Sequence, residues 1–295
     1  MTVKIICDTS ADLNLPNDET LYEKYDIEWV PMHVIFGTDD YKELVDLKTS
    51  EFYKMLLTAE KHPSTSQSTQ HDLLKAYEKF GDKYDEIISL HLSSKVSGAA
   101  ANAQFAKKMY EKTYPKGAKI HVYDTLTASS PLGMMAIKAT QLAKEGLNAT
   151  DLIKKLDEWR LNDYAFFFSV GDLKWLFQGG RLSRAKYYLG TLMSKSPVIA
   201  LVDGSLEVLK SISGLDNAVE AMIEMGLNDL QDDPKNITVH FLQAVFQKET
   251  EEYAKKIKEK YPDIKIGTIF TLGGVIASHT GPGTIGIVLT RNFEL

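Results

Sequence analysis

The sequence contains one cysteine, Cys7, and has no excess of positive charge. A single cysteine excludes a disulfide within the chain, and its place in the apolar run VKIIC favours a buried thiol without a chemical role. The net charge is -6 at pH 7, and lysine and arginine are scattered along the chain rather than gathered in a stripe. Nucleic-acid-binding proteins need such a basic surface, so we expect no DNA or RNA partner.

Long hydrophobic runs are also missing. No stretch approaches the roughly 18 consecutive apolar residues that a membrane-spanning helix needs, and the apolar run near the N-terminus is too short for a signal peptide. Hydrophobic residues still make up 44% of the chain, which is enough for a substantial core. We therefore expect a soluble, cytoplasmic protein without a spanning segment, long enough for one large α/β domain or two ordinary ones.

Signals for metals and nucleotides are absent or incomplete. The histidines show no H-x-x-x-H spacing, and one cysteine cannot complete a zinc site. GPGTIG fits the pattern G-x-G-x-x-G, but a dinucleotide site needs a helix and a second strand afterwards, and only nine residues follow Gly286. No Lys-Ser or Lys-Thr pair follows the glycines, which argues against a P-loop. We expect neither a metal nor a cofactor.

Short runs rich in β-branched residues alternate with helical patterns in the first part of the chain. Strands are predicted at VKIIC, EIISLHL and KIHVY, and helices at DLLKAYEKF and GAAANAQFAKKMY. In the second helix, the spacing places Ala101, Phe105 and Met109 on one apolar face. This order predicts an N-terminal three-layer α/β/α domain with a mainly parallel sheet, over residues 1–160.

From about residue 161 the pattern changes to that of a mixed sheet. YAFFFSV, NITVHFL, IKIGTIF and IGIVLT predict strands, and ETEEYAKKIKEKY predicts a charged helix. The pair Asp203-Gly204 between VIALV and SLEVL is typical of a two-residue β-hairpin turn, so antiparallel pairing enters here. We expect a C-terminal α/β domain over residues 161–295, with its helices on one face of a mixed sheet.

Four clusters of Ser, Thr and Asp stand where predicted strands end or helices begin. They are CDTSADL, HPSTSQST, HLSSKVSGAA, in which Ser97 would cap a helix, and YDTLTASSPLG. Each cluster alone could be structural, because these residue types are the usual helix N-caps. Ligand sites of open α/β sheets lie at this edge, and helix N-termini gathered there favour negative charge. The four clusters together predict a site for an anionic ligand.

Two further segments carry side chains suited to an anion. His279 precedes a Gly-Pro-Gly bend and is either a ligand contact or a structural histidine. In GDLKWLFQGGRLSRAKYYLG, Gly179 predicts a left-handed cap at the end of an apolar helix, and Arg181 and Arg184 follow. These arginines either interact with the helix dipole or present a guanidinium to a carboxylate or phosphate.

Five segments, taken in order, resemble motifs of the DegV family, whose members act as bacterial fatty-acid-binding proteins of the FakB type. CDTSADL is similar to the family's D-S-x-x-D-L, STSQST to T-S-Q-P-S, and LSSKVSGAAANA to S-S-x-L-S-G-T-y-q-S-A. QGGRL is similar to K-G-G-R-I, and SHTGPGTIG to H-x-G-P-G-x-x-G. The chain departs from these motifs at Ser68, Ala99 and Pro131, which stand for a proline, a hydroxyl residue and a glycine. These differences bear on which acyl chain fits.

The resemblance implies a two-domain α/β protein that holds one long-chain fatty acid in a tunnel between its domains. It implies that Thr65 and Ser97 hydrogen-bond the carboxylate and that His279 lies close to it. Arg181 would lie near the tunnel mouth and serve a partner fatty acid kinase, a dihydroxyacetone-kinase-like enzyme that converts the bound carboxylate to an acyl phosphate. The chain itself would be a carrier without catalytic residues. Further residues expected near the head group are Asp8, Thr9, Ser66, Ser93, Ser94, Gly98, Ser129 and Gly281.

The aliphatic tail should dominate the affinity. Burying about 15 methylenes at roughly 0.8 kcal/mol each gives on the order of 12 kcal/mol before the costs of binding. The apolar runs around Phe166, Phe167 and Phe168, and around Ile285 and Ile287, are candidates for the tunnel wall.

Two other functions compete with the carrier. A serine hydrolase or acyltransferase would use Ser97 or Ser93 with His279, but the sequence has no G-x-S-x-G nucleophile elbow. A kinase-like subunit that itself binds ATP would need a P-loop or a metal-binding acidic pair, and neither is evident.

Overall fold

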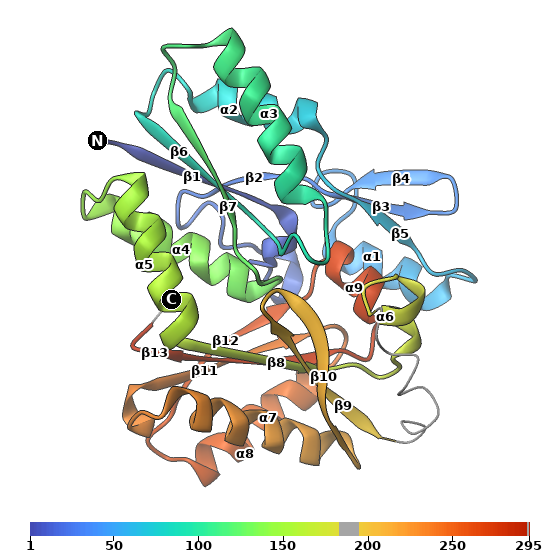
Figure 1. The fold of residues 1–295 in the computed structure, drawn as a ribbon. Helices are drawn as coiled ribbons and strands as arrows, with labels where there is room; N and C mark the ends of the chain where they lie inside the picture. The colour runs from blue at the N-terminus through green and yellow to red at the C-terminus, as the bar shows by residue number, and fades with distance from the viewer. Residues whose placement is uncertain (183–194, 294) are drawn as a thin grey trace.

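The N-terminal part of the protein is built around a four-stranded parallel sheet of order β2-β1-β6-β7 (Figure 1). The strands are β1 (Val3–Asp8), β2 (Glu28–Val30), β6 (Glu86–His91) and β7 (Lys119–Asp124). The structure is a computed structural model and describes residues 1–182, 195–293 and 295. β1 and β6 are buried along their whole length, which explains why both read as nearly continuous apolar runs.

Helices cover both faces of this sheet. α2 (Gln70–Phe80) and α3 (Ala99–Thr113) pack on one face, and α4 (Ser130–Lys144) and α5 (Ala149–Asn162) pack on the other (Figure 1). The predicted three-layer α/β/α arrangement with a parallel sheet is therefore confirmed, and Cys7 is buried in it, as expected.

The predicted apolar face of α3 is wrong. Phe105 and Met109 are 54% and 45% exposed, and Ala101 is exposed as well. The buried face instead carries Ala103 and Ala106, which pack against the sheet and α2. The physical reason is size, because small side chains let the helix lie close to its neighbours and the bulky apolar residues are left outside.

The C-terminal part contains a six-stranded mixed sheet of order β10-β9-β8-β13-β11-β12. β11 and β12 pair in parallel, whereas the other neighbouring strands pair antiparallel. α7 (Leu215–Leu230) and α8 (Gln247–Lys260) cover the face that points away from the N-terminal part (Figure 1). The mixed sheet with helices on one face is thus confirmed. Its strands are β8 (Tyr164–Ser169), β9 (Ser196–Val202), β10 (Ser205–Ile212), β11 (Ile237–Gln243), β12 (Lys265–Thr271) and β13 (Ile285–Arg291).

The predicted hairpin joins β9 to β10. Asp203 and Gly204 have φ angles of 47° and 79°, so both lie in the left-handed region that two-residue hairpin turns require. The hydroxyl of Ser93 donates a hydrogen bond of 2.7 Å to the carbonyl of Gly204. This contact attaches the hairpin to the N-terminal part.

A third sheet was not predicted from the sequence. It is antiparallel, of order β4-β3-β5, and consists of β3 (His33–Phe36), β4 (Asp39–Lys42) and β5 (Ser64–Ser66). β5 lies inside HPSTSQST, residues 62–69, for which we predicted no strand. α1 (Thr49–Thr58) and α9 (Gly274–Thr280) pack beside this sheet, and α6 (Lys174–Gln178) packs on α9. Short 3-10 helices span Thr9–Ala11, Pro16–Asp18 and Pro234–Asn236.

The N-terminal and C-terminal parts pack against each other. The domain boundary near residue 160 stays a prediction. α5 ends at Asn162 and β8 begins the second sheet at Tyr164. However, α9 from the C-terminal part packs on α1, β3 and β5, and Leu242, Phe270 and Val288 belong to the core cluster of the N-terminal part.

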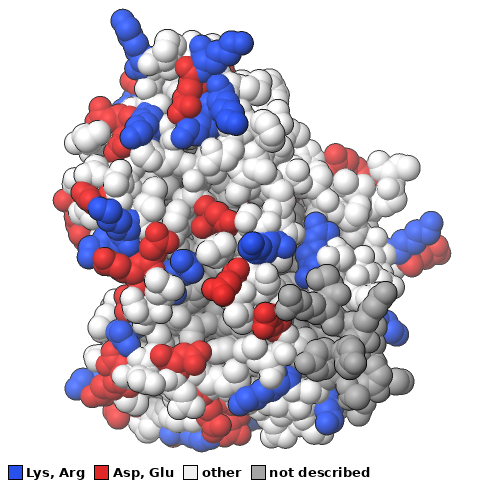
Figure 2. Space-filling model, in the orientation of Figure 1, with Lys and Arg blue, Asp and Glu red and all other residues white. Residues whose placement is uncertain are grey.

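The surface mixes charges of both signs. Figure 2 shows lysine and arginine interspersed with aspartate and glutamate over the face that it displays. Among the residues described, no helix is both long and apolar enough to cross a membrane.

Candidate functional site

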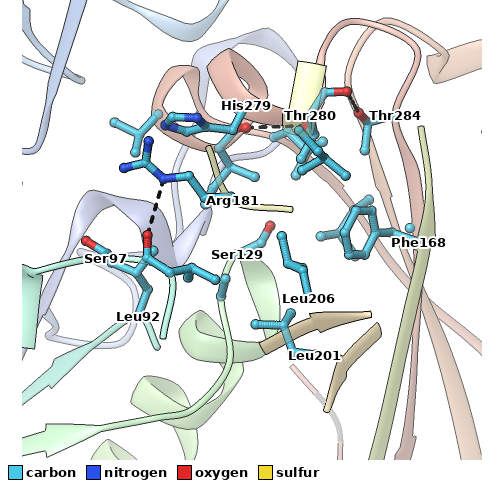
Figure 3. A pocket seen from close by; sticks show the side chains of 18 of the residues that line it. Leu92, Ser97, Ser129, Phe168, Arg181, Leu201, Leu206, His279, Thr280 and Thr284 are labelled. Atoms are coloured by element: carbon cyan, nitrogen blue, oxygen red, sulfur yellow. Dashed lines mark hydrogen bonds between the residues drawn. The ribbon is translucent and has the colours of Figure 1, made fainter. Parts of the chain in front are cut away.

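A cavity lies between the parallel sheet and the mixed sheet (Figure 3). The loops that follow β6 and β7 contribute Leu92 and Ala128, and the mixed sheet contributes residues such as Phe166 and Leu242. The lining is mostly hydrophobic, which is typical of sites for small ligands with an apolar part. Its polar members are Thr65, Ser97, Ser129, Arg181, His279, Thr280 and Thr284.

Strand alternation decides which of the predicted wall residues reach the cavity. Phe166 and Phe168 line it, whereas Phe167 points to the opposite face and packs under α7 and α8. Ile285 and Ile287 lie on that far face too, and Gly286 between them lines the cavity. The prediction was therefore right for two of the five wall residues and wrong for three. It assigned whole apolar runs to the wall, whereas successive side chains of a strand point to opposite faces of the sheet.

Thr65 and His279 meet in the cavity wall from distant parts of the chain. β5 presents Thr65, the last turn of α9 presents His279, and their Oγ1 and Nε2 atoms are hydrogen-bonded at 2.7 Å. His279 Nδ1 is buried and has no hydrogen-bond partner among the described residues, and it lies against Gly179, where a Cβ atom would collide with it. Burial, together with the charge of Arg181, lowers the pKa of His279 to about 4, so its ring is neutral at physiological pH.

Ser97 lies in the loop before α3. Its Oγ accepts a hydrogen bond of 3.2 Å from the Ala99 amide, and among the described residues no acceptor takes its hydroxyl proton. The helix N-cap is Gly98, one residue beyond the expected Ser97. Ser97 and Thr65 both line the same cavity.

Arg181 lines the cavity beside these groups. Its Nε donates to the Val96 carbonyl at 3.3 Å, its Nη1 donates to the Gly179 carbonyl, and burial lowers the pKa of its guanidinium. Figure 3 shows Arg181, His279 and Ser97 toward one side of the cavity and Phe168 toward the other. The left-handed residue in this segment is Gly180, with φ of 71°, rather than the predicted Gly179, whose φ is -67°. Arg184 lies outside the described residues.

Of the further residues expected near the head group, only Ser129 lines the cavity. Ser93 is fully buried and bonded to the hairpin turn, and Ser94 is exposed with its amide bonded to Asp124. Ser66 and Gly98 are exposed. Gly281, with φ of 81°, packs against the ring of Trp175. The roles of the site residues stay predictions.

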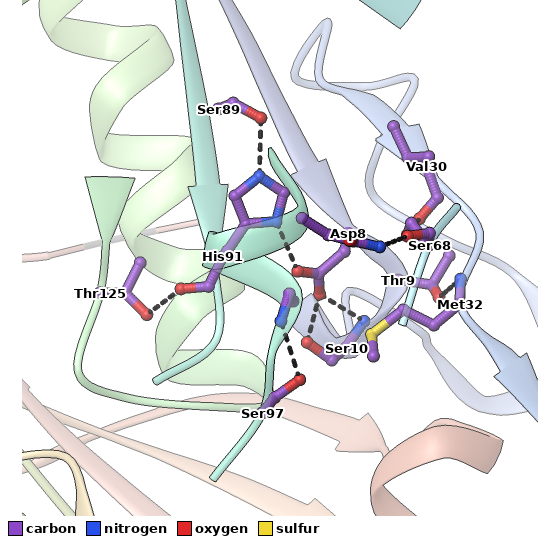
Figure 4. Close-up of polar contacts among 12 residues, drawn as sticks. Asp8, Thr9, Ser10, Val30, Met32, Ser68, Ser89, His91, Ser97 and Thr125 are labelled. Carbon is purple, nitrogen blue, oxygen red and sulfur yellow. Dashed lines mark hydrogen bonds and ion pairs between the residues drawn. The ribbon is translucent and has the colours of Figure 1, made fainter. Parts of the chain in front are cut away.

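Asp8 belongs to a buried hydrogen-bond chain away from the cavity (Figure 4). Ser89 Oγ and His91 Nε2 are 2.7 Å apart, and His91 Nδ1 and Asp8 Oδ2 are 2.9 Å apart. The order Ser-His-Asp is that of a catalytic triad, but Ser89 and Asp8 are 0% exposed, so no substrate reaches this serine. Thr9 is equally buried, and its Oγ1 accepts a hydrogen bond of 3.0 Å from the Met32 amide.

Sequence reasoning missed two polar residues of the lining, Thr280 and Thr284. Their hydroxyls donate to main-chain carbonyls, that of Thr284 to Gly281 at 2.8 Å and that of Thr280 to Ile276 at 3.3 Å. Nothing in the local sequence separates them from other threonines. Because both protons are used within the chain, these side chains present no free donor to a ligand.

The geometry gives no support to the serine hydrolase. Within the described part of the chain, no hydrogen bond joins Ser97 or Ser93 to His279, and the Nε2 atom that would act as base is bonded to Thr65. The segment GPGTIG runs from the end of α9 into β13, so it connects a helix to a strand, the reverse of the strand-to-helix order in a dinucleotide site.

Together, the fold and the cavity define an α/β protein that encloses an apolar chamber with hydrogen-bonding groups on one side. The chain belongs to the DegV family, because residues 2–292 match the family described as "Uncharacterised protein, DegV family". The family predicted from the five motifs is confirmed.

Named relatives and solved structures align with this chain over nearly its whole length. It is 31% identical over 290 residues to a protein of Thermotoga maritima named "Fatty acid-binding protein", covering 97% of this chain and 96% of that protein. The structure of DegV, a fatty acid binding protein from Bacillus subtilis, matches with a TM-score of 0.86 and 27% identity over 99% of both chains. The Streptococcus pneumoniae Fatty Acid Kinase (Fak) B3 protein loaded with linoleic acid matches with a TM-score of 0.80, over 99% of this chain and 100% of that one. Its identity of 20% shows a shared fold alone.

Proposed function

We propose that this protein binds one long-chain fatty acid in the cavity between its sheets and acts as its carrier. The observation that carries the proposal is the pairing of an apolar cavity with the hydrogen-bonding side chains of Thr65, Ser97 and His279 on one side of it. Two similar proteins, from Thermotoga maritima and Bacillus subtilis, are named as fatty-acid-binding, which supports the same ligand class here.

Thr65 and Ser97 would donate to the carboxylate. With the proton of the neutral His279 ring on Nε2, that nitrogen donates to Thr65 Oγ1, and the threonine hydroxyl is left free to donate to a ligand. The hydroxyl proton of Ser97 likewise has no acceptor within residues 1–182, 195–293 and 295. Hydrogen bonds to an ionised carboxylate are stronger than neutral ones, and the nearby Arg181 adds positive charge.

The remaining lining would hold the aliphatic tail. Leu201, Leu206 and Phe168 line the cavity away from Arg181 (Figure 3). Each buried methylene contributes roughly 0.8 kcal/mol, so the tail supplies most of the affinity and the polar end fixes the orientation.

The carrier would present its ligand to a kinase rather than act on it. The resemblance to the FakB type and the place of Arg181 beside the proposed carboxylate position support a partner fatty acid kinase that phosphorylates the bound acid. A cytoplasmic location, expected from the sequence, is part of this proposal.

The test is to identify the lipid bound to the purified protein. We expect mass spectrometry of the denatured protein to detect about one fatty acid per chain, and the delipidated protein to take up oleate or palmitate. Finding no lipid and no uptake of either acid would overturn the proposal. For presentation, the loaded protein is incubated with a dihydroxyacetone-kinase-like fatty acid kinase, ATP and magnesium, and acyl phosphate is trapped as its hydroxamate. Equal trapping with free fatty acid alone would contradict the presenting role.

A further inference from the structure

Asp12 lies outside the cavity but contacts two elements that form it. Its Oδ2 accepts a hydrogen bond of 2.6 Å from the hydroxyl of Ser129, and its Oδ1 accepts one of 3.0 Å from the amide of Gly273. Asp12 is 0% exposed, so both bonds are shielded from water. The cluster CDTSADL thus reaches the cavity through this carboxyl group rather than through Asp8 or Thr9.

Each partner of Asp12 leads directly to a side chain in the cavity. Ser129 itself lines the cavity and stands at the start of α4. Gly273 is the N-cap of α9, the short helix whose last turn carries His279. One carboxyl group therefore links Ser129 to the helix that carries His279, although the two residues are far apart in the sequence.

The backbone of Ser129 has an unfavourable conformation. Its φ of 60° and ψ of -150° lie in a region that residues other than glycine rarely adopt, at a cost of order 1–3 kcal/mol. Such a conformation persists only where surrounding contacts impose it, and the bond to Asp12 is the hydrogen bond that the Ser129 hydroxyl makes.

Close packing leaves these elements little freedom to adjust. A Cβ atom at Gly133 in α4 would lie 2.5 Å from the carbonyl oxygen of Ala11, next to Asp12. A Cβ atom at Gly273 would lie 2.6 Å from the carboxyl oxygens of both Asp12 and Glu43. Glu43 supports the same helix, because its Oε1 accepts a hydrogen bond of 3.0 Å from the Val275 amide.

We propose that Asp12 is a positioning residue of the cavity, whose carboxyl group fixes the Ser129 hydroxyl and the start of α9 and thereby sets the place of His279 relative to Ser129. The inference rests on the proposed function insofar as the ligand is a fatty acid. Asp12 does not touch the ligand and acts through its two partners.

The test is a double-mutant cycle on fatty acid affinity. An asparagine at position 12 keeps the shape and tolerates the left-handed backbone there, with φ of 42°. Its single oxygen accepts only one of the two hydrogen bonds, and its NH₂ group, in place of the other oxygen, can only donate, so the Ser129 hydroxyl and the Gly273 amide can no longer both donate to residue 12. We expect Asp12→Asn to weaken oleate binding about fivefold to tenfold, and to have an effect of less than about twofold when Ser129→Ala is already present. Glu86→Gln is the matched control, because Glu86 is a buried carboxyl group that accepts from the Ala149 amide at the start of α5, away from the cavity.

A second readout needs no ligand. In the lipid-free protein, the ring ¹⁵N chemical shifts of His279 should change in Asp12→Asn and stay as in the wild type in Glu86→Gln. The proposal is overturned if Asp12→Asn leaves the His279 shifts unchanged, or if it weakens oleate binding equally with and without Ser129→Ala. If the wild type takes up no fatty acid, the proposed function fails, while the His279 shifts still decide whether Asp12 positions the cavity.

Discussion

Two serines of the cavity differ in what their hydroxyl protons do. The proton of Ser129 is donated to Asp12, so only oxygen lone pairs face the cavity there. Ser97 uses its oxygen as acceptor, and in the part of the chain that the structure describes its proton has no acceptor. Of the two, Ser97 is therefore the one suited to bind a carboxylate, and this difference depends on hydrogen-bond partners that the sequence does not reveal.

Replacing Ser97 by alanine should weaken fatty acid binding about tenfold, because a hydrogen bond to a charged group is lost. The fold should survive, since the residue is only partly buried. Isothermal titration with oleate measures the affinity and thermal unfolding checks the fold. Ser64→Ala, at an exposed serine in β5, is the control and should bind as the wild type does. An unchanged dissociation constant in Ser97→Ala would remove this residue from the site.

At the scale of residues, the sequence placed some polar side chains in the cavity correctly and misplaced others. Thr65, Ser97, His279 and Arg181 were named from motifs, and all four line one cavity. Asp8, by contrast, stands in an equally polar cluster but is bonded to His91 inside the protein. A motif can contain residues that stabilise the fold and residues that line the site. Only the three-dimensional arrangement distinguishes these two kinds of residue.

The hairpin of β9 and β10 offers the clearest test at the scale of elements. Gly204, with φ of 79°, is packed so closely on Ser93 that a Cβ atom would collide with its hydroxyl. Gly204→Ala should lower the free energy of unfolding by more than the about 1–2 kcal/mol that a left-handed backbone costs an ordinary residue. Urea unfolding measures this loss.

Gly37→Ala is the matched control for the hairpin. Gly37 has a φ of 64°, but a Cβ atom there would meet nothing within 4 Å. Gly37→Ala should therefore lose only the stability that the left-handed backbone costs an alanine. If Gly204→Ala and Gly37→Ala lose equal free energy of unfolding, the close contact between Ser93 and the turn does not contribute to stability.

Elements with a strong local signal were predictable, and elements made by distant pairing were not. The turn at Asp203-Gly204 and the runs VKIIC and EIISLHL carry their structure in their own residues. β5 is only three residues long and forms because His33 and Val34 of β3 pair with Ser66 and Thr65. No window of the sequence around Thr65 contains that partner, so the segment looked like a loop.

At the scale of the whole molecule, the cavity exists because two sheets of different construction face each other. Leu92 and Ala128 follow strands of the parallel sheet, while Phe168 and Leu242 belong to the mixed sheet. Periodicity within either sheet cannot reveal such a shared space. The resemblance to the DegV family implied a tunnel between the two parts, and the structure places the apolar lining there.

The size of this space should set the length of acyl chain that binds. Gly286 lines the cavity from β13, and a Cβ atom there would make ordinary contacts of 3.4 Å with Leu242, Phe166 and Phe168. Gly286→Val should therefore be accommodated in the strand, which favours β-branched residues, while its side chain occupies part of the cavity. Each methylene that no longer fits costs about 0.8 kcal/mol, or roughly a fourfold loss of affinity.

We expect Gly286→Val to shift the chain-length preference toward shorter acids, measured as dissociation constants for saturated fatty acids from laurate to stearate. The control is Ile287→Val, which removes a methylene on the opposite face of the same strand and should lower stability by about 0.5–1.5 kcal/mol without changing the preference. If the two variants give the same chain-length profile as the wild type, the tail does not lie against β13. A shift in Gly286→Val alone would place the tail between the two sheets, because only that face of β13 borders the cavity.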